Sequence, residues 1–227
     1  MMKRLMNWLK QNKHVWFGLY VPIYLIAFFV VEGIVTPDSN YWVSYLPMDD
    51  MIPFIEYFAI PYWLWYPFLG AVGIYLILRD PPAFVRYMLA IMVSFTLTLI
   101  FFLVFPTGQN LRPTAFARDN ILTRMMALIY TADTNTNVLP SIHMVGSALA
   151  AIAIFDAPSL KGRRFLWVRL GTAALAALIS ISTVFVKQHS ILDIYVGLAV
   201  TVPFYFMVYN KPVRAWTDRT FGKSATA

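Results

Sequence analysis

A histidine and a carboxylate stand four residues apart at the start of an apolar segment near the end of the chain. His189 and Asp193 lie within the stretch Lys187-Gln-His-Ser-Ile-Leu-Asp193. On a helix this spacing places both side chains on one face, one turn apart. A carboxylate can hold one imidazole nitrogen and leave the other free for chemistry, whereas the simpler alternative is that Asp193 only caps the helix. Because ionisable groups within membrane segments usually serve a site, we take His189 and Asp193 as candidate catalytic residues.

A second polar group precedes another apolar segment. Ser141 follows a proline and is a good helix cap, and His143 lies in the first turn of the helix that Ser141 would begin. The free amides and positive end of such a helix favour an anion. Arg112 supplies a planar fork suited to phosphate, and Lys187 a point charge. These residue types predict a pocket for a phosphate or similar oxyanion, with Arg112, Ser141 and Lys187 binding its oxygens.

The composition indicates a membrane protein. Hydrophobic residues make up 59% of the 227 residues and charged residues only 13%, whereas roughly 25% is usual in soluble domains. The absence of cysteine excludes a disulfide framework and thiol chemistry. The net charge of +7 comes from short basic clusters between apolar runs. Such clusters are typical of topology signals, so we expect no nucleic-acid partner.

The apolar runs must position the candidate residues, and they predict an all-α fold. We expect residues 1–227 to form one domain, a polytopic bundle of six transmembrane helices, because each run is close to the ~20 residues that cross a bilayer. The predicted spans are about 15–36, 57–78, 87–105, 138–155, 170–186 and 190–209.

The basic residues predict the orientation of this bundle. Fourteen of the 18 lie on the side that holds both termini, which the positive-inside rule makes cytoplasmic. The opposite side holds Arg112, Arg118, Arg124 and Lys187. The polar groups around residues 110–113, 140–143 and 187–193 therefore converge at the extracytoplasmic face. We expect an integral protein of the plasma membrane.

Three rival kinds of site share these residues. Two histidines and an aspartate can bind zinc, but the nearby cations would repel a dication, so we expect no metal and no cofactor. A serine protease with Ser141 as nucleophile and His189 as base would lack the usual Gly-x-Ser-x-Gly surround. A proton-coupled transporter could use His143, His189 and Asp193 as a relay, although transporter sites usually lie near the bilayer midplane.

Taken in order, Arg112-Pro113, Pro140-Ser141-x-His143 and His189-x3-Asp193 resemble the three signature motifs of the type 2 phosphatidic acid phosphatase superfamily. This superfamily includes lipid phosphate phosphatases, and its motifs recur in vanadium haloperoxidases. The resemblance covers about residues 105–197. It implies a metal-independent enzyme in which His189 attacks phosphorus and becomes a phosphohistidine and Asp193 orients it. His143 would protonate the departing alcohol, while Arg112 and the Ser141 region hold the phosphate oxygens.

Two positions depart from the fuller family pattern. Phe105 stands where the first motif has a lysine, and Thr183 where the third has an arginine; Lys187 is our candidate replacement for one of these cations. A site with fewer cations is similar to the branch that contains inositol phosphorylceramide and sphingomyelin synthases. We therefore expect a lipid phosphate phosphatase, with a lipid headgroup phosphotransferase as the alternative and a proton-coupled transporter third.

Overall fold

The computed structural model describes residues 2–222, with side chains from residue 6 onward. Residue 1 and residues 223–227, which the predicted single domain and the orientation count include, lie outside the described part. Nine α-helices occur within it: α1 Met2–Gln11, α2 Tyr20–Ile34, α3 Ala59–Arg79, α4 Pro81–Val104, α5 Ile121–Ala132, α6 Ile142–Asp156, α7 Leu166–Phe185, α8 Ile191–Val208 and α9 Lys211–Phe221. Short 3-10 helices cover Lys13–Leu19, Pro47–Met51, Glu56–Phe58, Pro158–Leu160 and Arg163–Phe165.

Five helical segments are long and apolar enough to cross a membrane: Lys13–Ile34, Glu56–Arg79, Pro81–Val104, Arg163–Phe185 and Ile191–Val208. They correspond to five of the six predicted spans, and the third begins earlier than predicted, at Pro81. The predicted span at 138–155 is α6, which has 15 residues. A helix of this length is about 22 Å long, shorter than the ~30 Å hydrocarbon core. Six spans are therefore not confirmed, and α6 is a short helix packed against α4, α7 and α8.

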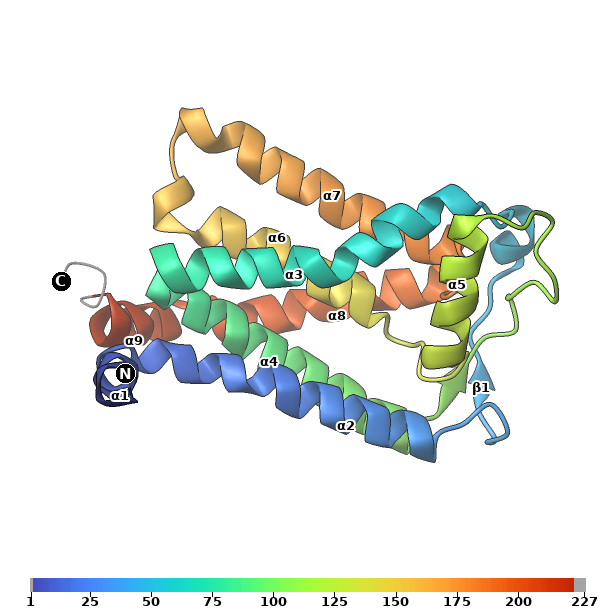
Figure 1. Ribbon diagram of the computed structural model, residues 1–227, viewed down its shortest axis with the longest axis horizontal. Helices are drawn as coiled ribbons and strands as arrows, with labels where there is room; N and C mark the ends of the chain where they lie inside the picture. The colour runs from blue at the N-terminus through green and yellow to red at the C-terminus, as the bar shows by residue number, and fades with distance from the viewer. Residues whose placement is uncertain (1, 223–227) are drawn as a thin grey trace.

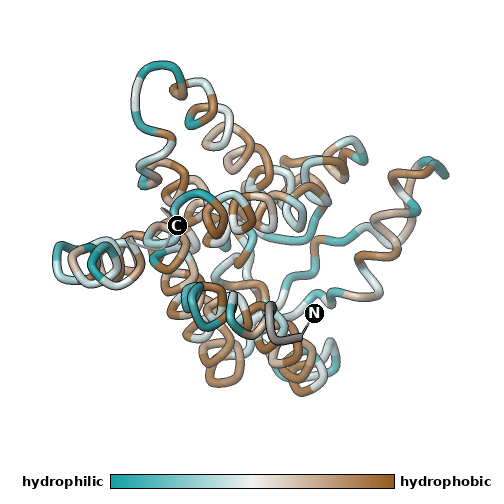
Figure 2. The backbone as a smooth tube through the Cα atoms, turned by 60° about the vertical axis from the view of Figure 1, so that its left-hand side comes forward, coloured by the Kyte–Doolittle hydropathy of each residue, from teal (hydrophilic) through white to brown (hydrophobic). Residues whose placement is uncertain are grey.

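The two ends of the bundle differ in character (Figure 1). Both described ends of the chain, with α1 and α9, lie at one end of the long axis. The other end carries α5, the long connections and a two-stranded parallel sheet that pairs β1 (Trp42–Val43) with β2 (Thr107–Gly108). Figure 2 shows that the helix bodies are mainly hydrophobic and that hydrophilic stretches gather in connections and at helix ends.

Close contact between α6 and α8 brings their N-termini together. Gly197 makes this possible, because a Cβ there would lie 3.1 Å from the Met144 side chain and 3.2 Å from the Ser141 carbonyl oxygen. The Ser141 backbone amide also donates to the Asp193 carbonyl at 3.2 Å. The first turns of α6 and α8, which carry His143 and Asp193, are thus neighbours. His189 lies two residues before α8 begins, in the turn after α7, and not on the helix as the spacing predicted.

Helix α5 is an element that the sequence analysis did not predict. Asn120 caps it, with its side-chain oxygen accepting from the amides of Leu122 at 2.9 Å and Thr123 at 3.1 Å. The helix lies across the end of the bundle instead of along it (Figure 1). Its buried Met126 and Ile129 pack in a separate apolar cluster with Tyr62 of α3. Helix α5 therefore packs against α3 and the Glu56–Phe58 turn, at the end of the bundle where α6 and α8 begin.

Candidate active site

His143, His189 and Asp193 form a continuous buried chain of polar contacts at the start of α6 and α8. Nδ1 of His189 lies 3.1 Å from Oδ2 of Asp193, and Nε2 of His189 lies 3.4 Å from Nδ1 of His143. The three residues are 3%, 5% and 0% exposed, respectively. The predicted convergence of the two histidines is confirmed at this distance.

Asp193 is held by three donors. Its Oδ1 accepts from the Ser44 hydroxyl, while its Oδ2 accepts from the Ser190 amide at 3.0 Å and faces His189. An ionised carboxylate is an acceptor only, so Nδ1 of His189 carries the proton that faces it. Nε2 of His189 is then the nitrogen with the lone pair, and it faces Nδ1 of His143. In a neutral imidazole this is the nucleophilic nitrogen.

A second buried carboxylate fixes the start of α8. Asp49 is fully buried, and its oxygens accept from the Ser190 hydroxyl at 2.6 Å, the Ile191 amide at 2.9 Å and the Leu46 amide at 2.8 Å. A negative charge at a helix N-terminus is favourable. Sequence reasoning identified neither Asp49 nor Ser44 as a site residue, because neither belongs to a recognisable spacing pattern.

His143 is held by aromatic rings and by the capped turn of α6. Its ring lies 4.8 Å from the ring of Tyr62 and 4.4 Å from that of Trp65, centroid to centroid. These two residues are three apart on α3 and so share one face. Ser141 caps α6 by accepting from the Met144 amide at 3.3 Å. The Ser141 hydroxyl thus has a structural partner, and its predicted contact with phosphate stays a prediction.

Arg112 is engaged with the surrounding loops and not with the histidines. Its guanidinium donates to the carbonyls of Tyr130 at 3.1 Å, Asp133 at 2.7 Å and Thr134 at 2.6 Å, and to Oε1 of Gln188 at 2.5 Å. Gln188 precedes His189 in the sequence, so this contact brings Arg112 to the same end of the bundle as His189. The sequence analysis predicted that these two polar groups converge. The donors of Arg112, however, are largely occupied by backbone oxygens.

Lys187 lies in the same turn as Gln188 and His189, but its side chain contacts the loop that contains Asp49. Its Nζ donates to the Asp49 carbonyl at 2.9 Å, and it forms no hydrogen bond with His143 or His189. Burial lowers the pKa of the Lys187 ammonium, against the raising effect of Asp49 and Asp50. In this structure Lys187 supports the loop around Asp49, and its predicted role as a replacement phosphate-binding cation stays a prediction.

Two further acidic residues lie close to the histidines. Oδ2 of Asp133 accepts from the Tyr62 hydroxyl and from Nε2 of Gln188, both at 3.2 Å. Burial, together with the charge of Glu32, raises the pKa of the Asp133 carboxyl to about 6, against the lowering effects of His189 and Arg112. Glu32 of α2 accepts from the Thr134 hydroxyl at 2.7 Å. Neither carboxylate was among the predicted site residues.

A small cavity of about 10 Å³ lies against both histidines and is also lined by Asp133, Asn137 and Gln188. This volume is close to that of a single water site, so a phosphate fits only after the walls part. Nε2 of His143 and Oδ1 of Asn137 are buried without a hydrogen-bond partner among the described residues. Buried polar atoms are normally paired, so these two atoms suit a polar ligand.

Comparison of the chain with protein-family models, with curated proteins and with solved structures finds no match. The functional assignment therefore depends on the motif pattern and on the geometry of the site. No cluster of three or more metal-ligating side chains occurs among the described residues.

Replacing Arg112 with alanine is expected to lower the free energy of unfolding by about 3 kcal/mol, because several buried acceptors would lose a charged donor. Thermal unfolding of the purified protein in detergent measures this effect. The matched control is Arg118→Ala, which removes an exposed ion pair with Glu56 and should cost less than about 1 kcal/mol. An Arg112→Ala protein of unchanged stability but weakened substrate binding would instead support the predicted contact with phosphate.

Asp133 should make stability depend on pH between about 4 and 6. The pKa of this carboxyl is higher in the folded protein than in the unfolded chain. Between about pH 4 and 6 the folded protein therefore holds this proton more tightly than the unfolded chain does, so the free energy of unfolding falls as the pH rises. Asp133→Asn keeps an acceptor oxygen and should be more stable than wild type by about 3 kcal/mol at pH 7. The difference should vanish near pH 4. Melting curves at both pH values test this, with exposed Asp38→Asn as control; an equal difference at the two values would contradict it.

Proposed function

We propose that this protein is an integral-membrane lipid phosphatase that works through a phosphohistidine on His189 and needs no metal. The observation that carries the proposal is the buried chain from Asp193 through His189 to His143, in which Nδ1 of His189 faces the carboxylate and Nε2 faces His143. One histidine in the first turn of α6 and another in the turn before α8, the latter oriented by a carboxylate, would supply the proton donor and the nucleophile that phosphoryl transfer to a side chain requires.

In the proposed first step, Nε2 of His189 attacks phosphorus and the bond from phosphorus to the ester oxygen breaks. His143 gives a proton to the departing lipid alcohol, and Asp193 stabilises the positive charge that develops on the His189 ring. In the second step, water attacks the phosphohistidine, the bond from phosphorus to nitrogen breaks, and phosphate leaves. His143, which lost its proton in the first step, accepts one from the water.

The proposed location is the extracytoplasmic face of the plasma membrane. The five apolar segments support a membrane setting, and the basic residues support cytoplasmic termini. His143 lies in the first turn of α6 and His189 in the turn just before α8, at the end of the bundle that also carries α5 (Figure 1). Because the cavity is closed, the proposal requires α5 and the neighbouring connections to move before the lipid headgroup can reach His189.

The second candidate is a headgroup phosphotransferase that uses the same phosphohistidine. The engagement of Arg112 and Lys187 with other groups favours it, because few free cations remain to neutralise a phosphate monoester. A phosphodiester donor carries one negative charge, less than a monoester at neutral pH. A lipid alcohol would then take the phosphoryl headgroup in place of water.

One assay separates the two candidates. The purified protein is incubated in chelator with phosphatidic acid, phosphatidylglycerol phosphate or a polyprenyl diphosphate, and separately with a phosphodiester lipid plus ceramide or diacylglycerol. Release of inorganic phosphate identifies the phosphatase, and a new phospholipid identifies the transferase. Formation of neither product, or equal products from wild type and His189→Ala, contradicts both.

A further inference from the structure

A groove runs along α6, α7 and α8, from Met144 in the first turn of α6 toward the end of the bundle that holds the termini. Its inner part is a cavity of about 540 Å³ with a wall of alanines, including Ala148 of α6 and Ala173 and Ala177 of α7. A cavity of about 450 Å³ adjoins it toward the end that holds the termini. Ile152 and Tyr205 line both cavities, so the two form one groove.

The chemistry of the groove changes along its length. The inner part is almost wholly apolar, whereas Lys161, Asp156 and Arg214 line the outer part. Asp156 accepts from Nε of Arg86 at 2.7 Å and also pairs with Arg214, while Arg86 pairs with Asp218 at 2.8 Å, so the charges of these four side chains cancel. The Lys161 side chain forms no hydrogen bond or ion pair with the described residues. The mouth of the groove therefore has an excess of positive charge.

Another cation lies beside this mouth. The guanidinium of Arg169 stands 5.7 Å from the ring of Phe155, which lines the outer cavity. Nε of Arg169 is buried without a hydrogen-bond partner in the described part of the chain. An apolar groove that ends in unneutralised cations is complementary to a lipid that has apolar acyl chains and an anionic headgroup.

We propose that this groove binds one anionic phospholipid from the leaflet at the end that holds the termini. Its phosphate lies between Lys161 and Arg214, and one acyl chain lies along the alanines of α6 and α7. In the predicted orientation this is the cytoplasmic leaflet, where anionic lipids attract basic segments. The proposed phosphate position is distant from the histidine site, because His143 and Asp156 are 13 residues apart on one helix, a rise of about 20 Å.

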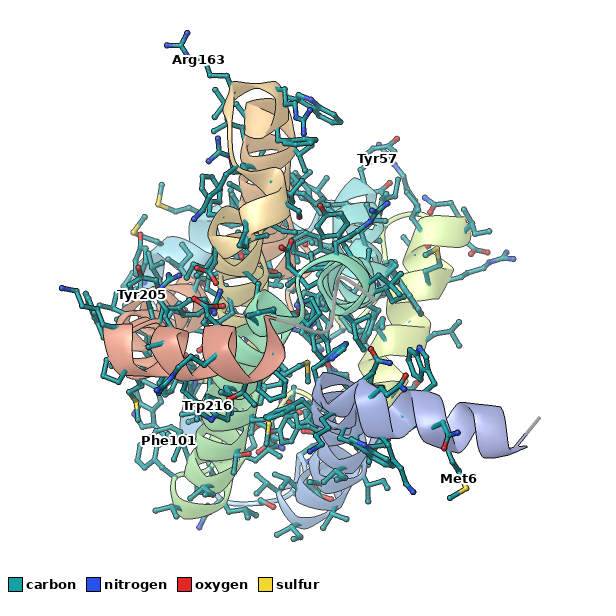
Figure 3. The ribbon with its side chains drawn as sticks, turned by 90° about the vertical axis from the view of Figure 1, so that its left-hand side faces the viewer. Met6, Tyr57, Phe101, Arg163, Tyr205 and Trp216 are labelled. Carbon is teal, nitrogen blue, oxygen red and sulfur yellow. The ribbon has the colours of Figure 1, made fainter. Side chains whose placement is uncertain are left out.

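A lipid fits this groove better than a second copy of the chain does. A symmetric contact would bring the same patch of each copy together, and the unpaired Lys161 side chains would then face each other. Figure 3 views the molecule from the end that holds the termini. Tyr205, which lines the groove, lies on the flank beside α9. Arg163 lies far from it, at the tip of the connection between α6 and α7. Arg163 thus serves as a control cation outside the groove.

Native mass spectrometry of the purified protein with phosphatidylglycerol, and separately with phosphatidylcholine, tests the proposal. Wild type should retain one phosphatidylglycerol in preference to phosphatidylcholine. Lys161→Gln should weaken phosphatidylglycerol binding about fivefold, since one basic residue near the surface contributes this much, while Arg163→Gln should not. Ala177→Phe fills the groove and should remove the bound lipid, whereas Ala174→Phe, exposed on the same helix outside the groove, should keep it.

Equal weakening by Lys161→Gln and Arg163→Gln would overturn the proposal, because it would show diffuse attraction to the basic connection. Unchanged binding in folded Ala177→Phe would do the same. Loss of a dimer in Ala177→Phe without a change in lipid binding would assign the groove to a second copy instead. His189→Ala should bind phosphatidylglycerol as wild type does, so the result is independent of the proposed catalysis.

Discussion

His189→Ala is expected to abolish turnover of every lipid phosphate that the wild-type protein accepts, with a loss of at least about 10⁴-fold in kcat. In the proposed mechanism no covalent route remains without Nε2 of His189. Neighbouring His143 cannot take its place, because its ring is packed between Tyr62 and Trp65 and no carboxylate orients it. Initial rates of phosphate release from the purified variant measure the effect.

His14→Ala is the matched control for this variant. His14 is also buried, but it lies at the opposite end of the bundle, with Nε2 3.2 Å from the Ile77 carbonyl. Its replacement should lower stability and leave the kcat of the folded protein close to that of wild type. Full activity in folded His189→Ala would remove the nucleophile assignment.

Asp193→Asn is expected to lower kcat by about 10³–10⁴-fold with little change in KM, because an amide cannot hold His189 in the required tautomer. The Asn side chain also cannot accept all the hydrogen bonds that Asp193 receives from Ser44, Ser190 and His189. Steady-state kinetics on the folded variant give both constants.

Ser44→Ala separates positioning from folding at the same carboxylate. It removes only the hydroxyl that donates to Oδ1 of Asp193, and the contact with His189 remains. We expect a fall in kcat of about tenfold. Residues that orient the histidine and carboxylate ligands of metal sites have effects of this size when they are replaced. A folded Asp193→Asn protein with wild-type kcat would contradict the role given to Asp193.

Much of the fold could be predicted because apolar runs of membrane length have few alternatives to a helix. The exception is α6, whose apolar run continues upstream of Ile142 although the helix itself has only 15 residues. The pairing of His189 with Asp193 followed from helical spacing, and the approach of His143 followed from the order of the runs. Helix α5 was missed because a short amphipathic helix across the bundle end carries no membrane-length signal.

The partners of the predicted cations could not be read from the sequence. Arg112 and Lys187 donate mainly to backbone carbonyls. Every residue has a backbone carbonyl, so the sequence does not indicate which of them accepts a hydrogen bond. Asp49 and Ser44 come from a loop more than 130 residues before α8, and only the folded chain shows that they hold its first turn. The motif pattern predicted which residues meet but not how the charge around them is arranged.

The most direct test of the account is to look for phosphate on His189. Purified wild-type protein is mixed with a phosphorus-labelled lipid phosphate in chelator and quenched in alkali, and its peptides are analysed by mass spectrometry. We expect an alkali-stable, acid-labile label on the peptide that contains His189, and none in His189→Ala. Release of phosphate with no label on any peptide at any quench time, or a label on another residue, would contradict the mechanism.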